Sequence, residues 1–457
     1  MPERNDERNS PPSGRAEKGS FTMAHTAGLL QELRSGRYDA ALTQLYGAAA
    51  VEVQRERYAA AVERFVEKFG EREEVFLFSA PGRTEIAGNH TDHNHGCVLA
   101  GAVDMDVIAV AARTDAPEIC VRSQGYPLDP VALRDLQVHE EERNGSAALI
   151  RGTAARFSEL GYRIGGMVVY TTSNVLKGSG LSSSAAFEVL IGVMLNHLYN
   201  DGAVSPVTVA QIAQYAENVY FGKPSGLMDQ MASSVGGIIS IDFADPQQPV
   251  IEQVPVDFAA AGYALCIVDV GGNHADLTHE YAAVPNEMRA VAWALGAEYL
   301  RDTDEEAVLR ALPQLRESCG DRAVLRALHF FRENRRVAAQ AAALKRGDFE
   351  EFCRLVIASG RSSFEYLQNV YAASAPDFQG MPIALALAEP MLEGHGAWRV
   401  HGGGFGGTTQ NFVPLDMVPA FTERMESVFG KGSCHVLSLR PFGGISVTEL
   451  AERTALE

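Results

Sequence analysis

Apolar residues follow helical spacing at the start of this chain and strand spacing further along it. From residue 23 to 69, Leu, Val and Phe recur every three or four positions among charged side chains, which predicts two or three helices. Val, Ile and Phe then concentrate in short runs at 75–79, 98–112, 166–172 and 236–242, each of which predicts a strand. The chain is therefore expected to begin with a helical collar and to continue into a sheet.

One predicted helix is apolar nearly all round. Residues 185–199 carry few polar side chains on any face, which is typical of a buried helix. The helix follows a predicted strand, 166–172, and a loop rich in Gly and Ser, 177–184. A strand, a glycine-rich loop and a buried helix in this order indicate an anion-binding site, because the N–H groups at the start of a helix have no partner within the helix. A further helix is expected at 211–221.

The second half of the chain is mostly helical. A strand-like run at 264–270 follows the Pro-flanked segment 249–257, which places a domain boundary between them. Helical spacing dominates 280–358, and short strands, a glycine loop and a helix near 417–428 close the chain. This order predicts an α+β fold in two domains. We expect a flexible extension over 1–22, N-terminal helices over 23–72, a first domain over 73–258 and a second, split α+β domain over 259–457.

Composition and charge narrow the class of protein. With 457 residues, 46% hydrophobic and 21% charged, the chain is long enough for two well-filled cores. Its formal net charge of −19 gives an acidic surface, so we expect neither a nucleic-acid nor a membrane partner. Six scattered cysteines without CxxC spacing, and a charged N-terminus without the apolar core of a secretion signal, favour the cytoplasm. A monomer is favoured.

The segment GLSSSAA, 180–186, carries the features of a phosphate loop. It lacks the lysine of the Walker pattern, which disfavours a P-loop NTPase fold. Glycine lets the backbone approach an anion, and the amides of Ser182, Ser183 and Ser184 would face phosphate oxygens at the start of the following helix. A serine hydroxyl could also bind Mg²⁺, which prefers oxygen ligands. The alternative is an ordinary helix cap after a glycine-rich loop.

Two acids follow this loop. Glu217 falls on a predicted helix, where it either binds a metal or lies on a solvated face. Asp229 stands between Leu227, Met228 and Met231, an environment that is costly for a charge without partners. Arg83 is its natural partner. A carboxylate in such a place can take a proton from an acceptor hydroxyl.

Two polar, glycine-bounded segments remain. GRTEIAGNHTDHNHG, 82–96, is predicted to be a loop that connects two strands, and its amides, imidazoles and carboxylates suit the recognition of a polyol. A solvated loop and a zinc site formed by His90, Asp92, His93 and His95 are the alternatives. HGGGFGG, 401–407, would let its backbone approach a nucleotide or the phosphate loop, or it is a tight turn between strands.

In this order and at these separations, the four segments GRTEIAGNHTDHNHG, GSGLSSSAA, GLMDQ and GGGFGG resemble the galactokinase branch of the GHMP small-molecule kinases. The resemblance extends from about Phe76 to the C-terminus. It implies a two-domain fold with a ribosomal-protein-S5-like N-terminal domain. It also implies an ATP- and Mg²⁺-dependent sugar-1-kinase, with galactose as the leading substrate.

The resemblance implies a role for each matching residue. Asp229 would be the catalytic base and Arg83 the cation beside it, while Ser184 and Glu217 would hold Mg²⁺. The nucleotide would contact Gly178, Ser179, Gly180, Leu181, Ser182, Ser183, Ser184 and Ala185. The sugar would contact Arg83, Asn89, His90, Asp92, Gly226, Asp229 and Tyr281.

The chain departs from the family pattern at three positions. The family usually has Glu where this chain has Asn89, Tyr at His93, and Pro at Ala100. The family glutamate accepts a hydrogen bond from the galactose 6-hydroxyl, whereas an amide is neutral and can also donate. We therefore hypothesise altered specificity at C6, which would admit galacturonate or arabinose. A kinase for N-acetylgalactosamine and a non-catalytic, kinase-like sugar sensor are further alternatives.

Overall fold

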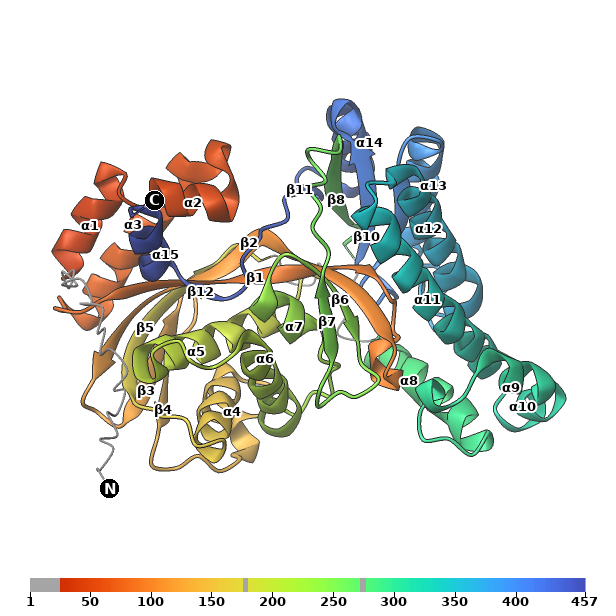
Figure 1. The fold of residues 1–457 in the computed structure, drawn as a ribbon, viewed down its shortest axis with the longest axis horizontal. Coiled ribbons are helices and arrows are strands. Elements are labelled where there is room, and N and C mark those ends of the chain that lie inside the picture. Colours follow the sequence, from red (N-terminus) through yellow and green to blue (C-terminus); the bar gives the residue numbers. More distant parts are fainter. Residues whose placement is uncertain (1–24, 176–179, 272–276, 457) are drawn as a thin grey trace, which may run out of the picture.

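Two α+β units make up the described part of the chain. The computed structural model describes residues 25–175, 180–271 and 277–456. The long strands of the first unit run from the N-terminal helices to the second unit (Figure 1). This arrangement agrees with the expected two-domain α+β fold.

The first unit is built on an eight-stranded sheet. Its strand order is β12-β1-β2-β5-β3-β4, and β6 and β7 extend it from β2. β3 and β5 pair in parallel, and the other neighbours are antiparallel. The strands are β1 (Phe76–Ala87), β2 (Cys97–Thr114), β3 (Glu118–Ser123), β4 (Leu128–Ala132), β5 (Gly166–Ser173), β6 (Ile238–Asp242), β7 (Val250–Gln253) and β12 (Ile445–Ser446).

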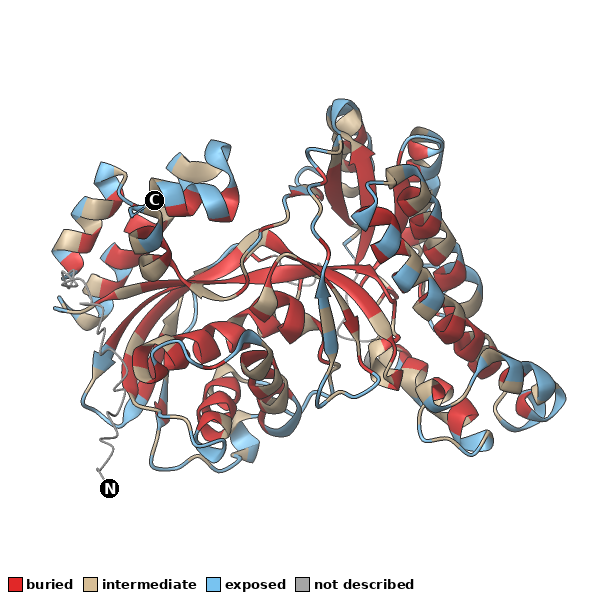
Figure 2. Cartoon of the chain, in the orientation of Figure 1, coloured by how far each residue is buried: buried red, intermediate tan, exposed pale blue. Residues whose placement is uncertain are grey.

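Helices cover both faces of this sheet (Figure 1). Leu77 packs with the collar helices, while Phe78 packs with α5 on the opposite face, as the two-residue period of a strand requires. α5 and the central strands are almost entirely buried (Figure 2). The collar consists of α1 (Thr26–Ser35), α2 (Asp39–Tyr46), α3 (Val51–Phe69) and α15 (Val447–Thr454); the other face carries α4 (Ser146–Glu159), α5 (Ser183–Asn200), α6 (Pro206–Tyr215) and α7 (Met228–Val235).

A buried carboxylate joins the collar to the sheet. Asp106 on β2 is fully buried and pairs with Arg57 of α3 at 2.6 Å and with Arg440, near the C-terminus, at 3.2 Å. Hydroxyl groups of Tyr46 and Ser79 donate to the same carboxylate. The Asp106 side chain therefore links the collar helices, the sheet and the segment before β12, which are distant from one another in sequence.

The second unit packs helices against a four-stranded sheet of order β11-β8-β10-β9. Within the described residues, no helix of either unit is long and apolar enough to cross a membrane. The strands are β8 (Tyr263–Asp269), β9 (Ala397–His401), β10 (Thr408–Pro414) and β11 (Cys434–Leu437). The helices are α8 (Thr278–Ala294), α9 (Glu305–Arg310), α10 (Leu312–Ser318), α11 (Asp321–Lys345), α12 (Phe349–Ser362), α13 (Gly380–Leu392) and α14 (Val418–Phe429).

Two sequence-based expectations are corrected by the fold. The segment 82–96 is not a loop throughout, since β1 continues to Ala87 by pairing with β2 through two register shifts. Arg83 therefore lies on a strand. The expected second domain does not extend to residue 457, because β12 pairs with β1 and α15 joins the collar. The chain thus crosses between the two units a second time near Leu439.

Candidate active site

Arg83 and Asp229 form an ion pair where β1 meets the starts of α5 and α7. The Arg83 Nε lies 2.7 Å from Asp229 Oδ1, and the Ser182 hydroxyl donates to Asp229 Oδ2 at 2.7 Å. A second nitrogen of Arg83 donates to the carbonyl of Gly180. Both carboxylate oxygens are thus held by donors, and the guanidinium links the acid to the phosphate loop.

These partners keep Asp229 ionised. Burial alone raises the pKa of this carboxyl, but the Arg83 charge and the hydrogen bonds from Arg83 and Ser182 outweigh burial and bring the pKa below its ordinary value. A quarter of the Asp229 side chain, 26%, remains exposed, whereas only 8% of the Arg83 side chain does. The carboxylate is therefore charged and accessible to a small molecule.

The described part of the phosphate loop leads directly into α5. Ser182 adopts a left-handed backbone with φ of 56° and makes no capping bond to α5, because its hydroxyl is directed to Asp229. The amides of the first turn, at Ser183 and Ser184, therefore face the loop. Leu181 and Ala185 are fully buried and anchor the loop in the core. Gly178 and Ser179 lie outside the described residues.

Ser184 and Glu217 come together as the expected metal ligands. The Ser184 hydroxyl lies 3.3 Å from Glu217 Oε1, and Gln230, next to Asp229, donates to Glu217 Oε2 at 2.7 Å. Glu217 is only 2% exposed, which excludes a solvated face. It lies in the π-helix η4 (Ala216–Phe221), an irregularity that often accompanies functional sites. A hydroxyl and a carboxylate fit Mg²⁺, which keeps its other positions for phosphates and water.

Lys223 and Glu188, which the sequence analysis missed, border this pair. Lys223 Nζ lies 2.9 Å from Glu217 Oε1, the same oxygen that faces Ser184. Glu188 of α5 accepts from Gln230 at 3.2 Å, and its Oε1 is buried without a partner. Burial, and then the nearby Glu217, raise the pKa of Glu188 well above its usual range. A lone acid in an otherwise apolar helix was the signal available in the sequence.

Replacing Lys223 by Met is expected to strengthen Mn²⁺ binding in the absence of nucleotide about 2- to 5-fold. The ammonium competes for an oxygen of the buried Glu217, and because more than half of the Lys223 side chain is exposed to screening solvent, the pair contributes about 0–1 kcal/mol. Calorimetric titration measures the change. Lys345→Met, which removes another Lys–Glu pair, between α11 and β7, is the control. Equal Mn²⁺ affinity in wild type and Lys223→Met would contradict the competition.

The candidate sugar-binding loop, residues 88–96, meets Gly226 and the C-terminal glycine loop. A methyl group at Gly226 would overlap the Asp92 carboxylate as it lies here, so the absence of a side chain at Gly226 lets the two segments touch. His90 Nε2 lies 2.9 Å from the Gly403 carbonyl. Burial lowers the pKa of His90 to about 3, so the neutral ring donates from Nε2 and keeps Nδ1 as an acceptor. The Tyr281 hydroxyl donates to the Gly404 carbonyl at 2.8 Å.

Asn89 lies in a buried polar network between the two units. Its amide nitrogen donates to Glu85 Oε1 at 3.0 Å and to the Gly402 carbonyl at 2.6 Å. Its amide oxygen accepts from Ser363 at 3.2 Å and from Asn369 at 2.7 Å. The residue is fully buried, and protein groups occupy all four hydrogen-bonding positions of its amide.

The geometry gives no support to a zinc site in this segment. His90 is directed to Gly403, while His95 stacks on Tyr299 with ring centroids 3.8 Å apart. Across the described ranges, no group of three or more His, Cys, Asp or Glu side chains is arranged to hold a metal ion.

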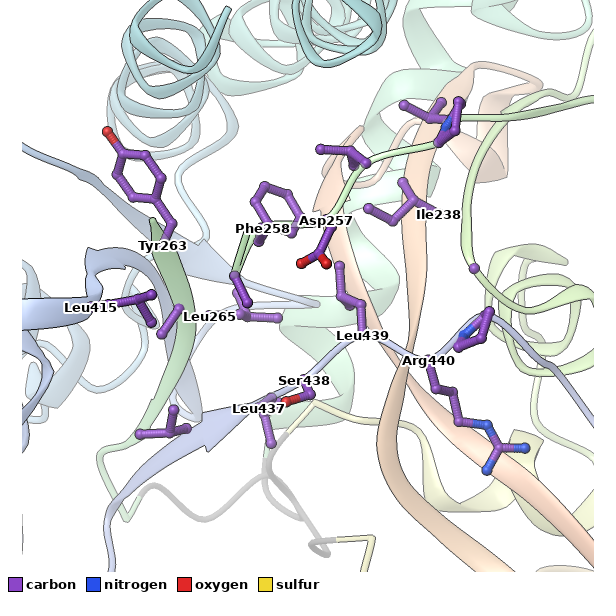
Figure 3. Close-up of a pocket in the computed structure, with 18 of the residues that line it drawn as sticks. Ile238, Asp257, Phe258, Tyr263, Leu265, Leu415, Leu437, Ser438, Leu439 and Arg440 are labelled. Carbon is purple, nitrogen blue, oxygen red and sulfur yellow. The ribbon is translucent and has the colours of Figure 1, made fainter. Parts of the chain in front are cut away.

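A separate pocket of about 490 Å³ lies where the chain crosses between the units. Figure 3 shows Asp257, Ser438 and Arg440 beside Ile238, Phe258 and Leu439 in its lining. The described lining contains none of the predicted site residues, so the pocket is distinct from the Arg83–Asp229 site.

Comparisons with known proteins identify the relatives of this chain. The galactokinase galactose-binding signature matches residues 63–113, and the GHMP kinases N-terminal domain matches residues 148–237. A galactokinase from Streptomyces coelicolor is 34% identical over 372 residues, covering 80% of this chain and 92% of that protein. A galactokinase from Homo sapiens is 32% identical over 393 residues, covering 84% and 95%.

Solved structures support the same fold. The crystal structure of Lactococcus lactis galactokinase complexed with galactose superposes with a TM-score of 0.73 at 24% identity, covering 85% of this chain and 99% of that one. A mevalonate kinase structure superposes with a TM-score of 0.56 at 13% identity, covering 79% and 98%. The expected GHMP kinase fold is therefore confirmed, and the sequence identities establish that this chain belongs to the galactokinase family.

Proposed function

We propose that this protein transfers the γ-phosphoryl group of ATP to the anomeric hydroxyl of galactose, giving galactose 1-phosphate and ADP. The observation that carries the proposal is the ionised, partly exposed Asp229, held by Arg83 and Ser182 beside the start of α5. Such an acid can orient a sugar hydroxyl toward a phosphate bound at the helix start.

In this mechanism Asp229 accepts the proton of the anomeric hydroxyl while that oxygen attacks the γ-phosphorus. The bond from phosphorus to the bridging oxygen of ADP breaks, and ADP leaves with the electron pair. Arg83 keeps the base ionised, and amides at Ser183 and Ser184 face the phosphates. Ser184 and Glu217 would hold Mg²⁺, which when bound neutralises phosphate charge.

The contacts of Asn89 count against a direct role for its amide in C6 specificity. The Asn89 amide is fully engaged by protein groups, so it is not free to donate to a sugar 6-hydroxyl. Galactose therefore remains the proposed substrate. All six cysteines are free thiols, which supports the proposed cytoplasmic location. We further propose a monomer.

A coupled ADP-release assay tests the proposed function. Galactose is expected to give a kcat/KM at least ten times those of arabinose, galacturonate and N-acetylgalactosamine. Equal or faster turnover of one of these sugars would reassign the substrate. Galactose-dependent thermal stabilisation without ADP release would instead identify a sensor.

A further inference from the structure

The contacts of Asn89 continue into a buried ion pair across the two units. Glu85 Oε1, which accepts from Asn89, also accepts from Arg399 of β9 at 2.7 Å. Arg399 is fully buried and donates to the Ile86 carbonyl at 2.7 Å. Glu85 thus supplies the carboxylate of this cluster and Asn89 its amide donors.

The same amide nitrogen of Asn89 also leads to the phosphate loop. It donates to the Gly402 carbonyl, and a methyl group added at Gly402 would lie 3.8 Å from the α-carbon of Gly180. The side chain of the preceding residue, His401, also lies close to Gly180: its Nδ1 would be 3.1 Å from a methyl group added at Gly180. Gly180 in turn accepts from Arg83. The C-terminal glycine loop therefore lies against the phosphate loop, and the Asn89 amide donates to the Gly402 carbonyl at the start of the glycine loop.

We propose that Asn89 is a positioning residue that fixes the C-terminal glycine loop against the phosphate loop, and that Glu85 takes over the buried carboxylate of this cluster. Asn89 therefore acts on nucleotide binding through Gly402 and does not select the sugar 6-hydroxyl. The inference rests on the proposed function only in assigning ATP to the phosphate loop.

Replacing Asn89 by Glu, the usual family residue, distinguishes the proposed positioning role from a role in selecting the sugar 6-hydroxyl. In Asn89→Glu, a second carboxylate enters the space beside Glu85 and the Gly402 carbonyl, where Arg399 is the cation paired with Glu85. The two N–H groups of Asn89 that donate to Glu85 and to the Gly402 carbonyl are lost in this variant. If Asn89 contacts the sugar, the same change restores the family's selection of the 6-hydroxyl. The roles predict opposite results.

We expect Asn89→Glu to lower the Tm and to weaken binding of a non-hydrolysable ATP analogue at least tenfold by calorimetry. Its kcat/KM ratio between galactose and arabinose should stay within twofold of wild type. The double variant Glu85→Gln/Asn89→Glu restores a single carboxylate beside Arg399 and should regain more than half of the lost Tm. His93→Tyr, a second exchange to the family residue in the same loop, is the control and should change the Tm little.

The proposal is overturned if Asn89→Glu keeps the wild-type Tm and nucleotide affinity and sharpens the preference for galactose. It is also overturned if the double variant regains none of the stability, because Glu85 and Asn89 would then be uncoupled. If Asn89→Glu does not fold, the Tm of the double variant tests the proposal. Nucleotide affinity and Tm require no sugar turnover, so these outcomes are separate from a failure of the proposed kinase activity.

Discussion

Asp229→Asn is expected to lower kcat by about 10²- to 10⁴-fold, the range typical of a lost general base. The substituted amide oxygen can still accept from Arg83, and the amide nitrogen can donate to Ser182, so the local geometry is retained. The variant loses the capacity to take the proton of the anomeric hydroxyl. We expect the Tm and the affinity for nucleotide to stay close to those of wild type.

Single-turnover ADP formation measures this loss without interference from product release. Asp201→Asn, an exposed aspartate at the end of α5 in the same unit, is the matched control and should retain full kcat. Near wild-type turnover by Asp229→Asn would remove Asp229 as the base and leave its carboxylate only a structural partner of Arg83.

Asp106→Asn is expected to lower the free energy of unfolding by about 3–5 kcal/mol, the usual cost of removing one partner from a buried charge cluster. The amide leaves the buried positive charges of Arg57 and Arg440 uncompensated, and these residues come from the collar and from the segment before β12. Urea unfolding followed by circular dichroism gives the difference.

Asp104→Asn is the matched control, since it changes a carboxyl to an amide in the same strand. Burial raises the pKa of Asp104 to about 6. Its carboxylate accepts a hydrogen bond from the Ser438 N–H, and the amide oxygen of Asn can still accept that bond. We expect a cost below about 1 kcal/mol for this change. If both variants lowered the free energy of unfolding equally, the Arg57–Asp106–Arg440 cluster would contribute no more to stability than the Asp104 hydrogen bond.

The same cluster predicts how stability depends on pH. Burial raises the pKa of Asp106, but Arg57 and Arg440 outweigh burial and lower it below the ordinary value. Because the folded pKa is depressed, its contribution is fully present above the unfolded pKa of about 3.9 and is lost as pH falls through the folded value. Unfolding at pH 2 to 5 should therefore depend less on pH in Asp106→Asn than in wild type.

Local patterning identified most of the sheet and helix content but missed several elements, among them β3, β4, α4, α7, α13 and α15. The apolar run around α5 and the helical spacing of α8 to α12 predict elements close to those observed. β3, β4 and α4 were not predicted. In β4 only Val131 is buried, and Asp129 and Pro130 weaken the alternating pattern. These elements form through tertiary contacts: β3 pairs with β5, and α4 packs against α5 and α6.

The sequence by itself determined the family, the α+β class and the set of chemical groups, because glycine spacing, serine runs and isolated acids are local properties of the chain. Only the tertiary structure decided how those groups are used. It directed Ser182 to Asp229 and placed Lys223 on Glu217, and it turned Asn89 into the junction between the units. Each of these contacts joins residues whose partners lie on other elements, and burial makes an unpaired polar group costly, so the choice of partner is a property of the folded chain alone.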